Sequence, residues 1–99
     1  MRIVVLGGAG MMGSIAARDL AESQAVGEVV IADLNRERAE EVAALLDSPK
    51  VSIVAVDLRD SEVLAGVLRG AGACLNATVY YTNLAVMEAC LEAGVAMVN

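Results

Sequence analysis

The 99-residue chain contains no histidine, tryptophan or phenylalanine, and it has only one proline and two cysteines. The absence of histidine removes the commonest general acid–base group and the commonest zinc ligand. Two cysteines are too few for a disulfide framework, and Cys74 and Cys90 lack the spacing of a metal site. We therefore expect two reduced thiols that pack as small apolar groups, and no metal.

Basic residues are also scarce. Seven Lys and Arg stand against thirteen Asp and Glu, which gives a formal net charge of −6. Nucleic acid and anionic membranes attract clustered Lys and Arg, so neither is expected as a partner. No apolar stretch approaches the length of a membrane span, and Arg2 leads directly into a short apolar run rather than into a signal peptide. These absences predict a cytoplasmic protein.

Small and medium aliphatic residues are abundant. Hydrophobic residues make up 58% of the chain, although only 2% are aromatic. Such a composition excludes a disordered chain and suits helices packed closely on a parallel sheet, whose central strands are buried on both faces. The length allows one domain at most.

One stretch near the start organises the rest. The apolar run Ile3-Val4-Val5-Leu6 leads into a loop that contains G-x-G-x-x-G at Gly8, Gly10 and Gly13. In a dinucleotide-binding turn the first glycine allows the tight turn, the second lets the backbone approach the pyrophosphate, and the third lets the helix pack on the strand. The free N–H groups and the dipole of that helix would then face the phosphates.

An acidic residue follows at the spacing that this motif requires. The run Val29-Val30-Ile31-Ala32 reads as a second strand, and Asp33 closes it, 20 residues after Gly13. Its carboxylate would accept hydrogen bonds from the ribose hydroxyls of the adenosine half. The alternative is a strand–helix turn without a ligand, in which Asp33 merely caps the next helix.

The remaining sequence alternates between apolar runs and segments with helical spacing. We expect strands at 2–6, 28–32, 51–56, 73–76 and 95–98. Helices are expected at 11–23, between Asn35 and Asp47, between Asp60 and Gly70, and from the Asn83 loop to Gly94. Short connections and right-handed crossovers then predict an α/β fold: a Rossmann-type, doubly wound parallel sheet of about five strands in the order 3-2-1-4-5.

Helical spacing also predicts which side chains face the core. The expected inward residues of the four helices are Met12, Ile15, Ala16 and Leu20; Ala39, Val42, Ala43 and Leu46; Val63, Leu64, Val67 and Leu68; and Leu84, Met87, Cys90 and Leu91. Met11 and Met12 are expected to pack at the start of the first helix, where one of them would touch the pyrophosphate.

Further candidates lie where the later strands end, because all carboxyl ends of the sheet face one crevice. Asp57 and Leu58 would flank the adenine, or else form an ordinary Asx turn. Asn76, Ala77 and Thr78 would lie along the cofactor toward the nicotinamide ribose, although Asn76 could instead satisfy backbone groups of its own loop.

Tyr80 and Tyr81 follow in a polar loop. A tyrosine can hold or protonate a substrate carbonyl, but no lysine or histidine lies nearby, so we expect the pair to pack against another domain or subunit. For the cofactor, the Asp33 carboxylate favours NAD because it would repel a 2′-phosphate, whereas Arg36 keeps NADP open.

Several segments together resemble a known family. The glycine loop, Asp57-Leu58-Arg59-Asp60, Leu75-Asn76-Ala77-Thr78 and the helix end at 87–95 are similar to the N-terminal NAD(P)-binding domain of saccharopine dehydrogenase-like proteins. That resemblance implies an oxidoreductase that acts on amino-acid-derived imines or secondary amines. It also implies that cofactor is bound at Gly8, Gly10, Met11, Met12, Asp33, Asp57, Leu58, Asn76, Ala77 and Thr78, to which the glycine motif adds Gly13.

The family pattern continues into a substrate domain that carries most catalytic residues, and here Ala96-Met97-Val98-Asn99 stands in place of that continuation. We therefore assign no catalytic residue and expect the isolated chain to bind cofactor without turnover. The alternatives are a regulatory nucleotide-sensing module and a truncated scaffold without a ligand. Free sheet edges also offer a route to a homodimer.

Overall fold

A computed structural model describes residues 1–78 and 83–98. It contains one parallel sheet in the order β3-β2-β1-β4-β5, which is the predicted order. The strands are β1 (Arg2–Leu6), β2 (Glu28–Asp33), β3 (Val51–Ala55), β4 (Ala73–Asn76) and β5 (Ala96–Val98). The helices are α1 (Met11–Glu22), α2 (Arg36–Leu46), α3 (Ser61–Leu68) and α4 (Asn83–Ala93). Predicted boundaries agree with these to within one or two residues at most ends.

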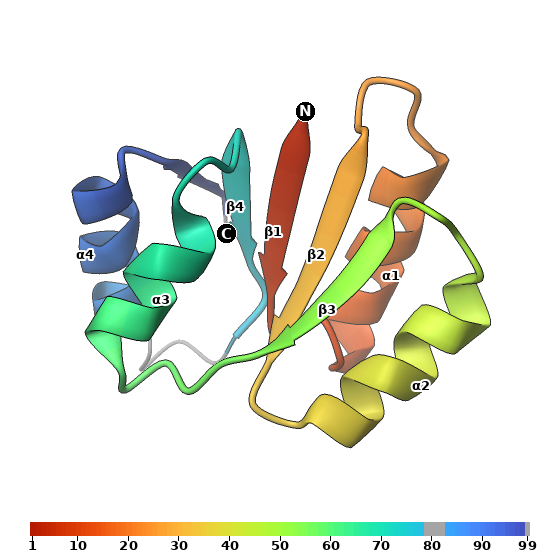
Figure 1. Cartoon of the computed structure of the whole chain (residues 1–99), viewed down its shortest axis with the longest axis horizontal. Coiled ribbons are helices and arrows are strands. Elements are labelled where there is room, and N and C mark those ends of the chain that lie inside the picture. Colours follow the sequence, from red (N-terminus) through yellow and green to blue (C-terminus); the bar gives the residue numbers. More distant parts are fainter. Residues whose placement is uncertain (79–82, 99) are drawn as a thin grey trace.

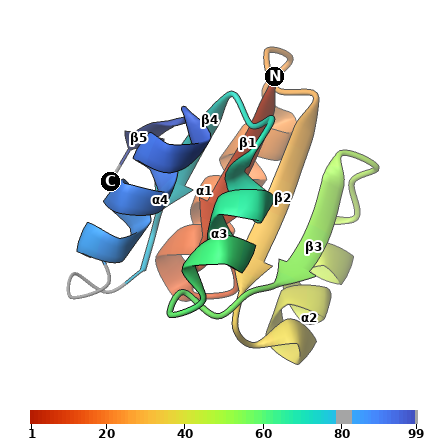
Figure 2. The ribbon, with the colours of Figure 1, turned by 60° about the vertical axis from the view of Figure 1, so that its left-hand side comes forward.

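The sheet lies between two layers of helices. Figure 1 shows α1 and α2 on one side and α3 and α4 on the other, and Figure 2 shows α3 and α4 in front of the sheet. Neighbouring side chains of β1 point to opposite layers: Val4 and Leu6 join the core beneath α3 and α4, whereas Ile3 and Val5 join the core beneath α1 and α2. Burial on both faces explains why the strand is apolar at every position from Ile3 onward.

Strand register brings the carboxyl ends of the strands to one edge. Leu6 of β1 pairs with Ala32 of β2 and with Asn76 of β4. Asp33 pairs in turn with Ala55 of β3. The segments that leave β1, β2, β3 and β4 therefore emerge side by side, as a doubly wound sheet requires.

The expected inner face of α1 is wrong in part. Gly13 and Ala17 are buried, whereas Met12 and Ile15 are 73% and 55% exposed, and Met11 is exposed too. The helix is pressed so closely against the glycine loop that only small residues fit beneath it. Tertiary packing therefore selects the face with glycine and alanine over the face with the larger apolar side chains.

The inner face of α4 is also predicted poorly. Of the four expected residues only Cys90 is buried, together with Val86 and Ala89, while Leu84, Met87 and Leu91 are exposed. This helix is apolar on several sides, so its periodicity does not single out one face. Contact with α3 and with the strands β4 and β5 decides the rotation instead.

The other two helices follow the pattern more closely. In α2, Ala39 and Val42 are buried, and Ala43 and Leu46 are partly buried, as expected. In α3, Leu64 and Leu68 are fully buried, but Val63 is 46% exposed and Ala65 takes the fourth inward position beside Val67.

The two cysteines are free and buried, as predicted. Cys74 lies on β4 and Cys90 on α4, within the same core cluster. Burial raises the pKa of Cys74 to about 12 and also raises the pKa of Cys90. Both thiols are therefore protonated at neutral pH and behave as small apolar groups.

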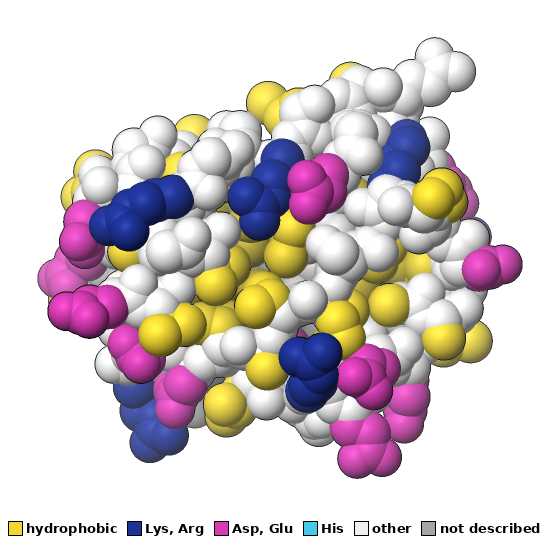
Figure 3. Space-filling model, in the orientation of Figure 1, with side chains coloured by type: hydrophobic (Ala, Val, Ile, Leu, Met, Phe, Trp, Pro, Cys, Tyr) yellow, Lys and Arg dark blue, Asp and Glu magenta, His cyan; other side chains and the backbone are white. Residues whose placement is uncertain are grey.

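Hydrophobic and acidic side chains are unevenly distributed over the surface. In the orientation of Figure 1, hydrophobic side chains reach the surface across the middle of the molecule, over α3 and toward β3, while acidic side chains gather toward the two ends (Figure 3). None of the helices in the described part of the chain is long and apolar enough to cross a membrane.

Candidate dinucleotide site

The glycine loop begins directly after β1. Gly7 adopts φ +75°, a left-handed conformation that glycine takes without strain, and its N–H donates to Ala32 O at 2.8 Å. The turn closes where Gly10 N–H donates to Gly7 O at 3.0 Å. The left-handed residue of the turn is thus Gly7, which the motif analysis did not single out, and not Gly8.

Two motif glycines are required by close packing. A Cβ on Gly13 would lie 2.1 Å from Gly7 O, and a Cβ on Gly8 would lie 2.7 Å from Ile31 Cγ2. A Cβ on Gly10 would meet only Gly7 O, at 3.3 Å. The third glycine therefore sets the contact between α1 and the loop, whereas Gly10 is exposed and leaves its outer side open to an approaching ligand.

The start of α1 lacks a capping side chain. Its N-cap is Gly10, which makes no side-chain hydrogen bond, and no acidic residue occupies the first turn. In contrast, Asn35 and Asp60 cap α2 and α3 by accepting from the backbone N–H groups of Arg38 and Val63. The α1 terminus is thus left available for an external anion, such as a pyrophosphate.

Asp33 links the end of β2 to the glycine loop. Its Oδ2 accepts from Ala9 N–H at 3.1 Å, and its Oδ1 accepts from Asn35 N–H at 3.0 Å. An ionised carboxylate has about four acceptor positions, so two bonds do not saturate it. The side chain is partly buried and lines the cavity described next.

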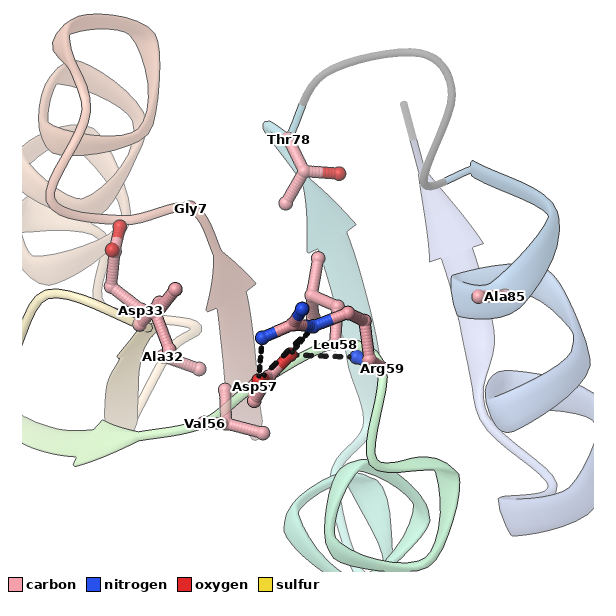
Figure 4. Close-up of a pocket in the computed structure, with 10 residues that line it drawn as sticks. Gly7, Ala32, Asp33, Val56, Asp57, Leu58, Arg59, Thr78 and Ala85 are labelled. Carbon is pink, nitrogen blue, oxygen red and sulfur yellow. Dashed lines mark hydrogen bonds and ion pairs between the residues drawn. The ribbon is translucent and has the colours of Figure 1, made fainter.

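A cavity of about 550 Å³ opens at this edge of the sheet (Figure 4). Its volume lies within the range of small-molecule and cofactor sites. Four of the predicted site residues line it: Asp33, Asp57, Leu58 and Thr78. The remaining lining residues were not predicted, and they are Gly7, Ala32, Leu34, Val56, Arg59 and Ala85.

The other predicted residues do not line this cavity. Gly8 and Gly13 are buried within the loop packing, and Met11 and Met12 project from the start of α1 with large exposed areas. Asn76 and Ala77 directly precede Thr78 in the chain but are not among the lining residues. Gly10 lies on the exposed side of the loop. The cavity thus joins the adenosine-side candidates with Thr78, which is a candidate of the nicotinamide half, while the pyrophosphate-side candidates lie outside its lining.

Asp57 and Arg59 form a close ion pair on the cavity wall. Arg59 Nη2 donates to Asp57 Oδ2 at 2.8 Å, and Arg59 Nε donates to Oδ1 at 3.0 Å. The Arg59 backbone N–H also donates to Oδ1 at 2.9 Å, which is an Asx turn. These hydrogen bonds lower the pKa of Asp57 to about 2, so its carboxylate stays charged until the pH falls from about 4 toward that value.

Asn76 satisfies its own loop, which is one of the two expected readings. The Thr78 backbone N–H donates to Asn76 Oδ1 at 3.1 Å, and the Thr78 hydroxyl donates to the same oxygen. Asn76 is buried, at 7% exposure. The bonds orient the first residues after β4, and Thr78 reaches the cavity. The expectation for Tyr80 and Tyr81 lies outside the described residues.

Sequence reasoning missed Arg59 although a local signal was present. An aspartate and an arginine two residues apart, directly after a strand, can pair across a turn.

Within 1–78 and 83–98, no group of three or more Cys, Asp or Glu side chains gathers as a metal site would require.

The chain has recognisable relatives. Residues 3–99 match the saccharopine dehydrogenase NADP-binding domain. A curated relative, carboxyaminopropylagmatine dehydrogenase of Synechocystis sp., is 33% identical over 96% of the chain, which spans 24% of that protein's length.

Solved structures agree on the fold. Apo saccharopine dehydrogenase (L-Glu forming) of Saccharomyces cerevisiae has a TM-score of 0.83 at 18% identity, over 97% of this chain and 20% of that one. DesIV, a dTDP-glucose 4,6-dehydratase of Streptomyces venezuelae solved with NAD, has a TM-score of 0.76 at 25% identity, over 96% of this chain and 37% of that one. The chain belongs to the saccharopine dehydrogenase NADP-binding domain family, and its cofactor is NAD or NADP.

Proposed function

We propose that residues 1–99 are the dinucleotide-binding domain of a larger oxidoreductase and that this domain prefers NAD(H) to NADP(H). The observation that carries the proposal is the Asp33 carboxylate, which joins the end of β2 to the glycine loop and lines the cavity. A carboxylate there would accept from both ribose hydroxyls and repel a 2′-phosphate.

The surroundings of Arg36 support the same preference. Its Nε donates to Glu40 at 3.2 Å within α2, and its side chain is not part of the cavity wall. A 2′-phosphate needs a nearby cation, and this one is already paired with a carboxylate. The family description names NADP, so the preference proposed here departs from that description.

The chain's own groups fit a dinucleotide. The uncapped start of α1 would hold the pyrophosphate through backbone N–H groups, and the packing of Gly13 keeps that turn close to β1. Asp33 would hold the adenosine ribose, and the apolar cavity walls would exclude water from the adenine. Gly8, Gly10, Met11 and Met12 remain proposed contacts of the pyrophosphate half, and Asn76, Ala77 and Thr78 of the nicotinamide half.

The bound dinucleotide supplies the hydride-transfer chemistry. We propose that the whole protein transfers hydride to or from an amino-acid-derived imine or secondary amine, with a substrate domain outside this chain. The names of the relatives, a saccharopine dehydrogenase and a carboxyaminopropylagmatine dehydrogenase, support that substrate class. The family match favours an oxidoreductase over a nucleotide sensor or an empty scaffold.

The test is a calorimetric titration of the folded chain with NADH and with NADPH. We expect tighter binding of NADH, and we expect Asp33→Asn to weaken NADH about 10-fold to 100-fold, because a hydrogen bond to a charged group is lost. Asp19→Asn, on the exposed side of α1, removes the same charge away from the cavity and should change nothing.

Each outcome has a distinct meaning. Tighter NADPH than NADH would contradict the role of Asp33 and point to Arg36. If neither cofactor binds to a chain that circular dichroism shows to be folded, the proposed function is overturned.

A further inference from the structure

Arg59 lines the cavity without a role in the proposed binding of ribose or pyrophosphate. Its side chain is 87% exposed, yet it is held in one arrangement by three side-chain hydrogen bonds to Asp57. Ion pairs this exposed contribute little to stability, and fixing a long side chain costs conformational entropy. The pair is therefore poorly explained as a stabilising feature of the fold.

The hydrogen bonds leave Asp57 with little capacity for a ligand. Oδ1 accepts from the Arg59 backbone N–H and from Nε, and Oδ2 accepts from Nη2 and Nε. These three N–H groups, with the single Nε hydrogen shared between the two oxygens, occupy most of the about four acceptor positions of a carboxylate. Asp57 is thus badly placed to accept a hydrogen bond from the 6-amino group of an adenine, which was one of its expected roles.

The same hydrogen bonds fix the plane of the guanidinium. Two adjacent N–H groups of Arg59 meet the two carboxylate oxygens, so the fork cannot rotate freely. Figure 4 shows the side chain folded back from its loop toward Asp57. A planar, weakly hydrated cation held in this way presents a flat face to the cavity, and such faces stack on aromatic rings.

Apolar side chains line the same part of the cavity, as binding of an adenine ring requires. Leu34 follows β2 and reaches the cavity although it is 67% exposed, while Leu58 packs partly into the core beneath the same opening. Asp33, which would bind the adenosine ribose, lies between Ala32 and Leu34. The adenine attached to that ribose must therefore lie in this part of the cavity.

We propose that Arg59 is a positioning residue for the adenine ring, with its guanidinium stacked on the base and Leu34 among the apolar side chains that enclose it. Asp57 then serves to hold Arg59 and does not itself read the 6-amino group. This inference rests on the proposed function, since it concerns the adenosine half of the same dinucleotide.

Titrations of three variants of the folded chain with NADH test it. Arg59→Ala should weaken NADH about 3-fold to 30-fold, the range expected for loss of a cation–aromatic contact. Arg59→Lys keeps the positive charge but removes the planar guanidinium, so it should weaken NADH binding nearly as much as Arg59→Ala. Arg18→Ala removes another exposed arginine, paired with Glu22 on α1 and outside the lining of the cavity, and should leave the affinity unchanged.

A second ligand separates stacking from reading of the amine. Nicotinamide hypoxanthine dinucleotide carries an oxo group where NADH carries the 6-amino group. The wild-type chain should bind its reduced form within about 3-fold of NADH, because stacking tolerates a change at the ring edge. Asp57→Asn should lower the affinity for both ligands by the same factor, and by no more than Arg59→Ala does. The double variant with Asp57→Asn and Arg59→Ala should bind only slightly more weakly than Arg59→Ala alone.

The failures are distinguishable. NADH binding that Arg59→Ala leaves intact, or Arg59→Lys that binds like wild type, would overturn the role of Arg59 while the proposed function stands. A loss of 10-fold or more with the hypoxanthine ligand would assign the amine to Asp57 and equally overturn the inference. Absence of any NADH binding to the wild-type chain would remove both proposals together.

Discussion

Gly13 and Gly66 both lie within helices, but a methyl group would meet very different surroundings at the two positions. At Gly13 the added Cβ would lie 2.1 Å from a backbone oxygen, whereas at Gly66 it would meet nothing within 4 Å. One glycine is thus required by the contact between α1 and the loop, and the other is not. Motif spacing had pointed to the first and was silent on the second.

We expect Gly13→Ala to destabilise the chain by about 1–3 kcal/mol or more, because backbone must move to make room. It should also weaken NADH binding, since the displaced atoms belong to the pyrophosphate loop. Gly66→Ala should stabilise by about 0.5–1 kcal/mol, through the higher helix propensity of alanine. Urea unfolding measures the stability change of each variant, and equal changes in the free energy of unfolding would contradict the packing argument.

At the scale of the element, the helices of this fold differ in whether a side chain caps their N-terminus. Asp60 accepts from Val63 N–H at 3.2 Å at the start of α3, and Asn35 accepts from Arg38 N–H at the start of α2. The start of α1 has no such side chain. The difference fits a helix whose terminus serves a ligand rather than its own capping.

Asp60→Ala should therefore lower the free energy of unfolding by about 1 kcal/mol, the usual cost of losing a cap. Asp60→Ser keeps an acceptor at the same place and should retain most of the stability. Thermal or urea unfolding checks the pair. A loss of the same size in both variants would show that the charge of Asp60, and not its capping bond, is what matters.

Gly94 illustrates a boundary that the pattern predicted well. It adopts φ +72° directly after α4, and Val95 N–H donates back to Cys90 O at 2.9 Å. A left-handed glycine at this position is a common end for a helix. Boundaries were readable because they depend on local backbone chemistry, whereas the buried face of α4 depends on neighbours far away in the chain.

At the scale of the whole molecule, the buried thiols report on global unfolding. Cys74 and Cys90 lie in the core between the sheet and α3 and α4, so reagent reaches them only when the chain opens. We expect labelling by a thiol reagent at pH 8 to be slow in the folded chain and fast in urea. NADH at about 100 times its Kd should slow labelling about 100-fold, because it binds only the folded state.

Alkaline pH should destabilise the molecule through the same thiols. The pKa of Cys74 is about 12 when folded and about 8.5 when unfolded, so the folded state holds its proton more tightly. The free energy of unfolding should be flat with respect to this group below about pH 8.5 and fall as the pH rises from there toward 12. Comparison with Cys74→Ala, which lacks the group, isolates the effect.

The homodimer and the separate substrate domain remain predictions. The short edge strand β5 and the exposed side chains of Leu91 and Val98 leave apolar surface on that side of the sheet. Sedimentation of the chain over a range of concentrations tests the homodimer directly.

The sequence by itself determined the alternation of strands and helices, the strand order and the location of the glycine loop and Asp33. These follow from local periodicity, turn chemistry and the handedness of crossovers, all of which act over short stretches of chain. Only the tertiary structure decided that α1 buries Gly13 and Ala17 instead of Met12 and Ile15, because that choice depends on how closely the helix meets the loop. It also decided that Arg59 turns back onto Asp57 at the cavity wall, since the direction of an exposed side chain is set by the groups that surround it in space.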